Sequence, residues 1–388
     1  MYKIFLKKNE TGKILSGHSW VYANQVLRIE GKGKNGDIAY VYTFDGKFLG
    51  KGYINHLSKI LVRIISKDET EELDEQFYER RIRKANNLRL MLGYDNCYRV
   101  VYAEADGLPA LIVDKYADLL SVQFLSLAME QVKNIIVDAL VAIFAPRGIF
   151  ERSDSPVREK EGLPLVKQKL YGNFEPKVII EENGIKMVVD LENGQKTGYF
   201  LDQKENRMAV RRYSKDRQVL DCFSNSGAFS LNCLMAGARS VTALDISQSA
   251  IDNIAINAQL NNLTVDTRAC DVFDELRKLK RENKKFDLII LDPPAFCKSA
   301  SEVEGALRGY KDINILAMQL LNEGGILATC SCSHYMTMQL FENMLVDASR
   351  ESKHTVKILE RRTQSPDHPS LVGSDETLYL KFYILQVD

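Results

Sequence analysis

The sequence predicts an α/β fold for the second half of the chain: a mostly parallel, doubly wound sheet of seven strands whose last strand is antiparallel. A small β-barrel and an α+β middle region precede it. Strand-like runs alternate with helix-like segments after residue 218, short aromatic and β-branched runs split by hairpin turns fill residues 1–68, and residues 98–190 mix both patterns. These observations predict three domains, at residues 1–70, 71–190 and 191–388.

The amino-terminal region has the composition of a small barrel with an anionic partner. The segments IFLKK, HSWVYANQV and KILVRII are β-branched and aromatic, and Lys-Asn-Gly and Asp-Gly are hairpin signals. Residues 1–68 hold 12 lysines and arginines against 5 acids, although the whole chain has no net charge. This excess favours a polyanion partner; ordinary variation on a solvated surface is the alternative.

The middle region is expected to begin with a helix that has one basic face. FYERRIRKANNLRLML has apolar residues at helical spacing, and its opposite face is predicted to carry Arg80, Arg81, Arg83, Lys84 and Arg89. Such a face either grips phosphates or is simply solvated. Strand hairpins and a single amphipathic helix, AMEQVKNIIVDALVAIF, complete this region.

The α/β region contains seven strand-like runs, of which the first five are separated by helix-like segments. Their order implies right-handed crossovers in a parallel sheet. The closing run TLYLKFYILQV is long and alternating, as an antiparallel strand would be. The runs lie near 218–223, 240–245, 264–270, 286–291, 325–332, 355–361 and 377–387.

Composition excludes several other classes of protein. No segment approaches the roughly 18 apolar residues of a membrane span, and MYKIFLKKNE lacks the apolar core of a signal peptide, so we expect a cytoplasmic protein without a membrane partner. The seven dispersed cysteines argue against a disulfide framework. A zinc site at Cys330, Cys332 and His334 would lack a fourth ligand, so no metal is expected.

Acids at successive strand ends point to a nucleoside ligand that carries a cation. Asp221 in VLDCFSNSG, Asp245 in ALDIS and Asp271 each end a strand, where open α/β sheets bind ligands. Only Gly227 of the first turn is a glycine, so the dinucleotide fingerprint is weak. Hydroxyls, an amino group and an ammonium suit these acids, and S-adenosylmethionine has all three. A helix N-cap is the alternative for any one acid, and Asp202 in the GQKTGYFLDQ segment is likewise either a cap or a ligand contact.

The last two strand ends suggest covalent chemistry on a base. LDPPAF places Asp292 before two prolines, which make a rigid strand exit whose polar groups can hold a flat base by its edge. TCSCSH places Cys330 and Cys332 on one face, with Cys332 nearer the crevice. A thiolate that adds to C6 of a pyrimidine makes C5 nucleophilic, and a base must later remove the C5 proton. That base is not identifiable, and His334 is better interpreted as a neighbouring polar residue.

Together these motifs identify the chain as similar to a known family. SGHSWVYANQV and GKGKNGD resemble a PUA domain, and LDCFSNSGAFS, ALDIS, LDPPAF and SCSH resemble Rossmann-like class I S-adenosylmethionine-dependent methyltransferases. The whole chain resembles the PUA-containing RNA cytosine-5 methyltransferases that act on large-subunit (23S) ribosomal RNA. The resemblance implies Cys332 as nucleophile and Asp292 as the base-edge contact. It implies cofactor contacts at Lys196, Thr197, Phe200, Asp202, Asp221, Phe223, Ser224, Gly227, Asp245, Ile246, Asp271, Val272, Asp292 and Pro293.

One departure and three alternatives accompany this interpretation. Many such enzymes have a second cysteine directly after the two prolines, where this chain has Ala295, with Cys297 two residues later; the product-release step is thus unassigned. Methylation of an exocyclic amine of adenine or guanine would need no cysteine, and 5-methyluridine formation is chemically close. A non-catalytic RNA-binding or ribosome-assembly factor is a further class. The sequence leaves open whether the chain forms a homodimer.

Overall fold

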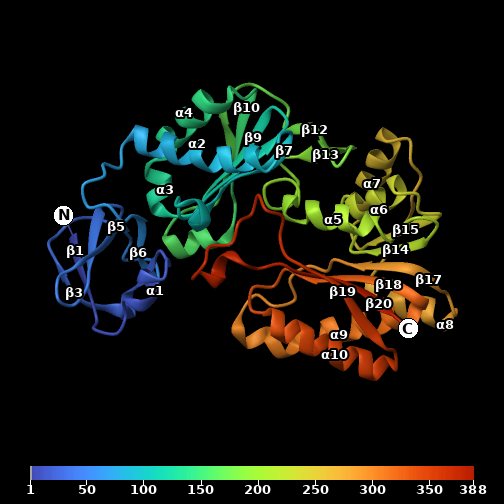
Figure 1. Cartoon of the computed structure of the whole chain (residues 1–388). Helices are drawn as coiled ribbons and strands as arrows, with labels where there is room; N and C mark the ends of the chain where they lie inside the picture. Colours follow the sequence, from blue (N-terminus) through green and yellow to red (C-terminus); the bar gives the residue numbers. More distant parts are fainter. Residues whose placement is uncertain (1) are drawn as a thin grey trace. The chain divides into compact units, whose positions relative to one another are not determined.

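The computed structural model describes residues 2–388 and divides into two compact units (Figure 1). Unit 1 comprises residues 1–180, 189–201 and 366–377, and unit 2 comprises 181–188, 202–365 and 378–388. Each unit is assembled from three separate stretches of the chain, so the boundaries of the units are not single positions in the sequence. The three-domain division drawn from the sequence stays a prediction.

The first part of unit 1 is a six-stranded sheet with the strand order β2-β6-β5-β4-β1-β3. It is antiparallel except for the parallel β1–β4 pair. Alternate side chains of these strands form one apolar core, as the barrel-like sequence pattern predicts. The elements are β1 (Tyr2–Leu6), α1 (Gly12–Leu15), β2 (Trp20–Tyr22), β3 (Val26–Glu30), β4 (Ile38–Tyr42), β5 (Phe48–Ile54) and β6 (Ile60–Ser66).

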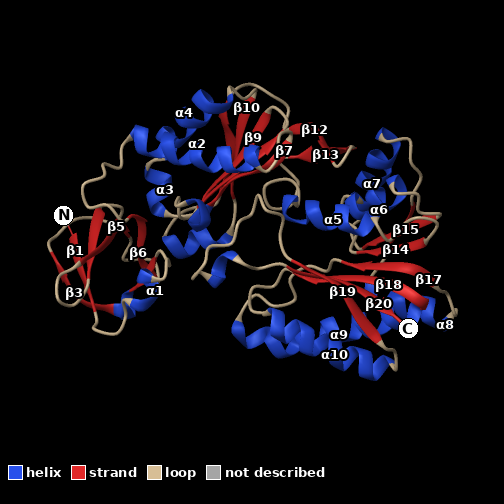
Figure 2. Cartoon of the chain, viewed as in Figure 1, coloured by secondary structure: helices blue, strands red, loops and turns tan. Residues whose placement is uncertain are grey.

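The second part of unit 1 is a five-stranded sheet packed against helices (Figure 2). Its order is β11-β10-β9-β8-β7, and β9 and β10 are parallel. The elements are α2 (Glu75–Met91), β7 (Cys97–Tyr102), β8 (Leu111–Tyr116), β9 (Leu119–Phe124), α3 (Leu127–Gln131), α4 (Lys133–Phe144), β10 (Gly148–Ser153) and β11 (Val166–Tyr171). The single helix expected over residues 128–144 is therefore wrong: the helix breaks at Val132, whose φ of −97° and ψ of 13° leave the α-helical region.

Helix α2 begins where the sequence predicts and has the predicted apolar face, but its basic face is smaller than expected. The side chain of Asp74 caps the helix by accepting a hydrogen bond from the Phe77 amide. Arg89, which we expected on the basic face, is fully buried and forms ion pairs with Asp106 through both guanidinium Nη atoms (2.6 and 2.8 Å). That expectation was wrong because a buried carboxylate compensates the charge, which periodicity cannot reveal.

Unit 2 is built on a seven-stranded sheet of order β16-β15-β14-β17-β18-β20-β19. The pairs from β16 to β18 are parallel, whereas β20 is antiparallel to both β18 and β19, which confirms the predicted α/β fold and its antiparallel last strand. The strands are β14 (Gln218–Cys222), β15 (Ser240–Asp245), β16 (Asp266–Ala269), β17 (Phe286–Leu291), β18 (Leu321–Ser331), β19 (Val356–Arg362) and β20 (Lys381–Val387). A two-stranded sheet, β12 (Lys177–Glu182) with β13 (Ile185–Asp190), lies at the division of the units.

Helices cover both faces of this sheet (Figure 1). One face packs against α8 (Val272–Arg281), α9 (Val303–Leu320) and α10 (Met338–Ser352), and the other against α5 (Lys204–Arg211), α6 (Ala228–Met235) and α7 (Gln248–Leu260). Successive residues of the central strands alternate between the two cores, so these strands are apolar throughout. The fold leaves the carboxyl ends of β14, β15, β17 and β18 together at one edge, which positions the site.

Candidate active site at the carboxyl edge of the sheet

The turn after β14 has an unusual backbone. Phe223, Asn225 and Gly227 all have positive φ, at 62°, 49° and 77°. A Cβ on Gly227 would lie 2.9 Å from Ile254 Cγ2, so only glycine fits there without a shift. The amide and the hydroxyl of Ser224 both bind the Leu244 carbonyl (3.0 Å each), which ties the turn to β15. The turn thus has a left-handed backbone conformation that L-residues rarely adopt, and such conformations are typical of functional loops.

Asp221 is a buried carboxyl at the end of β14 with hydrogen-bonding capacity left over. Its Oδ2 accepts from the amide and the hydroxyl of Ser230 (3.0 and 2.6 Å), whereas its Oδ1 is buried without a hydrogen-bond partner in the described residues. Burial, together with Asp292 and Asp245, raises the pKa of Asp221 to about 7. An unsatisfied buried acceptor is costly, and a ligand ammonium or hydroxyl would satisfy it.

Asp245 organises the neighbouring strand end. Its two oxygens accept the amides of Asn225 and Ser247 (2.9 Å each), so it links the β14 turn to the start of α7. Ile246, which follows it, is 72% exposed and offers an apolar surface beside this carboxylate.

Asp271 and Val272 lie at the start of α8. The Asp271 side chain accepts the Asp274 amide (3.1 Å), so Asp271 is the helix N-cap that we considered as an alternative. Its side chain is exposed, so capping does not prevent a ligand contact. Val272 is buried in the core that packs against α9. Neither position is tested as a cofactor contact, and both stay predictions.

Asp292 follows β17 and is held by two donors. Gln203 Nε2 donates to its Oδ1 (3.0 Å), and the thiol of Cys330 donates to the same oxygen (2.9 Å). Burial raises the pKa of Asp292. Pro293 is buried directly after it, which fixes the strand exit.

The two cysteines at the end of β18 differ in exposure. Both contact the same core, as expected for residues two apart, but Cys330 is completely buried and Cys332 is partly exposed just beyond the strand. Burial and Asp292 hold the pKa of the Cys330 thiol well above its usual range, so Cys330 is a protonated hydrogen-bond donor. Exposure therefore favours Cys332 as the reactive sulfur. Cys297 is buried and donates to the Ser299 carbonyl (3.0 Å).

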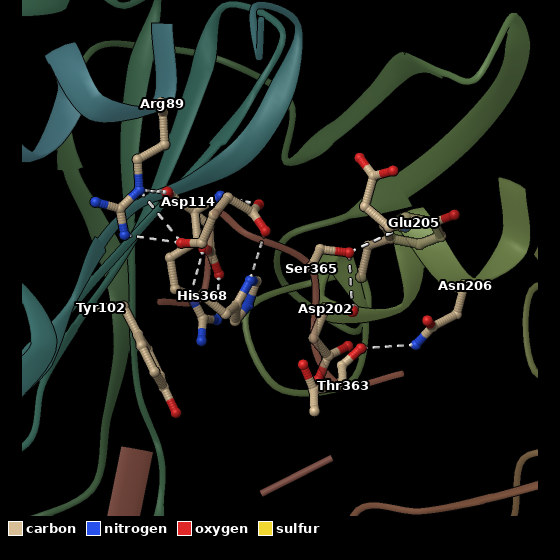
Figure 3. A network of polar contacts seen from close by, with 12 residues as sticks. Arg89, Tyr102, Asp114, Asp202, Glu205, Asn206, Thr363, Ser365 and His368 are labelled. Atoms are coloured by element: carbon tan, nitrogen blue, oxygen red, sulfur yellow. Dashed lines mark hydrogen bonds and ion pairs between the residues drawn. The ribbon is translucent and has the colours of Figure 1, made fainter. Parts of the chain in front are cut away.

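The segment that carries Gln203 is anchored within unit 2 by residues 363–365 (Figure 3). The amide and the hydroxyl of Ser365 donate to the Asp202 carbonyl (2.8 and 3.0 Å), and Asn206 Nδ2 donates to the Thr363 carbonyl (3.1 Å). Asp202 does not cap α5, whose N-cap is Gln203; its Oδ2 accepts from Tyr379 Oη (2.6 Å). The capping alternative for Asp202 was wrong because a short 3₁₀ turn, Leu201–Gln203, precedes the helix.

Two residues of this edge were missed by sequence reasoning. Gln203 gave no signal, because one glutamine before a helix is common. Lys381 gave a weak signal, because it is a lysine at the start of the mostly apolar strand KFYILQV. In the structure this lysine is buried.

Three predicted cofactor residues, Lys196, Thr197 and Phe200, belong to unit 1. Thr197 is buried and donates to Asp114 Oδ2 (2.6 Å), and Lys196 lies over the Phe200 ring at 4.7 Å from its centre. Thr197 thus has a structural role, and the cofactor role of all three stays a prediction.

The basic face of α2 is partly neutralised. Arg80 and Arg81 pair with Glu71 (2.8 and 3.6 Å), and Arg83 pairs with Glu79 (2.6 Å). Lys84 is exposed beside a cavity of about 560 Å³ that Lys67, Arg81 and Lys84 line in unit 1.

Within residues 2–388, no group of three His, Cys, Asp or Glu side chains is arranged to hold a metal ion. None of the helices described above combines the length and the apolar character that a membrane crossing needs.

Two protein families match separate parts of the chain. Residues 4–67 match the PUA-like domain family, and residues 168–381, more than half of the chain, match the S-adenosylmethionine-dependent methyltransferase family. The ribosomal RNA large subunit methyltransferase I of Klebsiella pneumoniae (strain 342) is 40% identical over 393 residues, covering 99% of this chain and 98% of the relative. The protein of the same name from Escherichia coli O9:H4 (strain HS) is 39% identical, covering 99% of both chains.

Two solved structures have the same fold. A SAM-dependent methyltransferase from Streptococcus mutans superimposes with a TM-score of 0.84 at 22% identity, and a methyltransferase solved with SAH superimposes with a TM-score of 0.86 at 22% identity. Both matches cover 100% of each chain.

Proposed function

Because the chain belongs to the ribosomal RNA large subunit methyltransferase I family and to the S-adenosylmethionine-dependent methyltransferases, we propose that it methylates C5 of a cytosine in large-subunit ribosomal RNA. The supporting observation is that a partly exposed cysteine, Cys332, and a carboxyl, Asp292, follow the neighbouring parallel strands β18 and β17. Their side chains are therefore available at one edge of the sheet.

The residues at this edge suit the cofactor. The unsatisfied Oδ1 of Asp221 is an acceptor for an ammonium or hydroxyl group, and Gly227 allows the turn to pack closely against Ile254 in a left-handed conformation. Asp245, Ile246 and Asp271 are proposed to bind the ribose and the adenine. When bound, S-adenosylmethionine supplies a methyl group on a positively charged sulfur.

The proposed chemistry divides between the thiol and the carboxyl. The Cys332 thiolate forms a bond to C6 of the pyrimidine, and the electrons of the C5–C6 double bond move so that C5 becomes nucleophilic. After C5 is methylated, loss of the C5 proton restores the double bond and expels the thiolate. Asp292 holds the base edge throughout, with one oxygen fixed by Gln203 and Cys330.

The environment of Asp292 favours cytosine over uridine. The raised pKa of Asp292 increases the fraction of the carboxyl that is protonated at a given pH. A protonated carboxyl can donate a hydrogen bond to N3 of cytosine. Uridine has an N3–H donor at that position and would need the ionised form.

Methylation of an exocyclic amine is the second candidate, because the Asp-Pro-Pro segment alone could hold an amino group. It differs from the leading proposal in needing no sulfur. A purely RNA-binding factor is the third, and it would give no heat of S-adenosylmethionine binding in calorimetry.

The decisive experiment compares Cys332→Ala with Cys97→Ala, which removes a buried thiol of β7 in unit 1. Ribosomal RNA from a strain lacking the protein is methylated in vitro, and the product nucleoside is identified by mass spectrometry. We expect 5-methylcytosine, a loss of roughly a thousandfold or more with Cys332→Ala, and a covalent complex with RNA containing 5-fluorocytosine. Retained activity of Cys332→Ala, or a methylated amine, would refute the proposal.

The RNA is proposed to bind unit 1 through the basic face of α2. Arg80, Arg81 and Arg83 pair with glutamates, whereas Lys84 makes no ion pair among the described residues. The cavity that Lys84 shares with Lys67 is large enough for a nucleotide. Its two acids, Glu104 and Asp106, are paired with Arg63 and Arg89, so its lysines suit a phosphate.

A further inference from the structure

Lys381 is a buried lysine at the start of β20, beside the strand end that carries the reactive cysteine. It is 3% exposed and lies directly opposite Ser331 in the antiparallel β18–β20 pair. Its Nζ donates to the carbonyl of Ser333, the residue after Cys332, and to the carbonyl of Tyr379 (2.6 and 2.7 Å). The ammonium is thus fixed to the backbone beside the cysteine.

This ammonium lacks a carboxylate partner. Both acceptors are neutral carbonyls, and within residues 2–388 Lys381 takes part in no ion pair with an acid. Burying a cation without a counter-ion is expensive, and folded proteins usually avoid it. A buried charge kept at such cost, next to a proposed nucleophile, calls for a functional explanation.

The ionisable groups that surround Lys381 supply this functional explanation. Burial lowers the pKa of Lys381, and the nearby thiols of Cys332, Cys330 and Cys297 act in the opposite direction, Cys332 most of all. Cys330 is bonded to Asp292 and Cys297 to a carbonyl, so both thiols are engaged as donors. Tyr310 of α9 is hydrogen-bonded to the hydroxyls of Ser331 and Ser333, on either side of Cys332 in the chain, and its pKa is raised to about 12 by burial.

We propose that the Lys381 ammonium is the built-in counter-ion of the Cys332 thiolate and keeps this cysteine in its nucleophilic form. The assignment rests on Cys332 being the nucleophile of the proposed reaction. The thiol proton leaves to solvent, and Lys381 stays protonated as a positioning residue. Burial lowers the pKa of Lys381 to about 8, and the nearby thiols oppose that shift, so the cation persists near neutral pH.

The test measures the thiol directly and does not depend on methylation. The rate at which iodoacetamide alkylates Cys332 is followed against pH by mass spectrometry of the peptide, with Cys332→Ser as the blank. In the wild type we expect half-maximal reactivity clearly below the ordinary thiol pKa of about 8.5. Lys381→Met should move this midpoint up by about one unit or more, a roughly tenfold slower reaction near neutral pH.

Two controls separate charge from structure. Lys381→Arg keeps the charge and should stay within about threefold of the wild-type rate, a change worth less than half a pKa unit. Lys357→Met removes a 58% exposed lysine of the adjacent strand β19 and should leave the midpoint unchanged. Cofactor binding by calorimetry checks that each variant is folded.

A wild-type midpoint at or above about 8.5, or equal midpoints in the wild type and Lys381→Met, would overturn the proposal. If Lys381→Met does not fold, the wild-type midpoint still decides. If Cys332→Ala still methylates RNA, the proposed reaction fails, whereas the alkylation midpoint continues to report on the Lys381–Cys332 pair.

Discussion

Gln203 and Asp292, 89 positions apart in the sequence, are joined by a hydrogen bond of 3.0 Å from Gln203 Nε2 to Asp292 Oδ1. Gln203 itself is buried, and its Oε1 accepts from Asn206 Nδ2 (2.7 Å), so the amide is held from both ends. The amide thereby fixes the orientation of the carboxyl that is proposed to hold the base. Gln203 acts through Asp292 and is a positioning residue.

Gln203→Ala is expected to lower kcat for RNA methylation by roughly tenfold to a hundredfold, because a hydrogen bond to an ionisable group contributes about 1.5–3 kcal/mol. The KM for S-adenosylmethionine should change little, since the Asp221–Gly227 turn is untouched. Steady-state kinetics at saturating RNA would measure both constants.

Gln339→Ala is the matched control, because the Gln339 side chain donates to Asn343 on the exposed surface of α10. A loss in kcat with Gln339→Ala, or a Gln203→Ala enzyme that changes only the KM for the cofactor, would contradict the positioning role.

Arg89→Met should destabilise unit 1 by about 3–5 kcal/mol, because it leaves a buried carboxylate without its partner. Arg89 is fully buried and Asp106 is 5% exposed, and Arg89 Nη2 also donates to the Asp367 carbonyl (2.8 Å; Figure 3 shows Arg89). Urea unfolding followed by circular dichroism measures the difference. Arg83→Met, on the exposed side of the same helix, should cost no more than about 0.5 kcal/mol; equal losses would refute this account.

The sequence predicted the centre of the unit 2 sheet well because β14, β15 and β17 are short, mostly apolar runs with an acid at or next to the end. Asp221, Asp245 and Asp292 all lie at the expected edge of the sheet, since parallel strands place their carboxyl ends together. Arg89, Gln203 and Lys381 could not be placed in this way. Each has a role set by a partner far away in the sequence, and such pairings leave no periodic signal.

The stability of the protein should fall as the pH rises from about 4 to about 7, through Asp221. Its pKa is about 7 in the folded state and about 3.9 in an unfolded chain, so the native state binds the proton more tightly. The contribution of Asp221 is fully present below about pH 4, declines up to about pH 7 and is constant above. The shift corresponds to at most about 4 kcal/mol.

Asp221→Asn should remove this contribution, because asparagine does not titrate. The free energies of unfolding of the wild type and the variant, measured in urea at several pH values, should converge or cross as the pH rises and then run parallel. A constant difference across the whole range would show that Asp221 is ionised in the folded protein at every pH tested.

Lys84→Ala should weaken RNA binding and make it less dependent on salt, because the exposed ammonium is proposed to contact one phosphate. Loss of one such contact lowers the slope of log K against log salt concentration by roughly 0.7–0.9. Filter binding of a ribosomal RNA fragment over a series of salt concentrations measures this slope. Lys177→Ala is the control, because Lys177 is a 67% exposed lysine of unit 1 in the β12–β13 hairpin, away from α2. If both variants lower the slope equally, Lys84 contributes only to the overall charge of the protein. Lys84 would then make no specific contact with a phosphate.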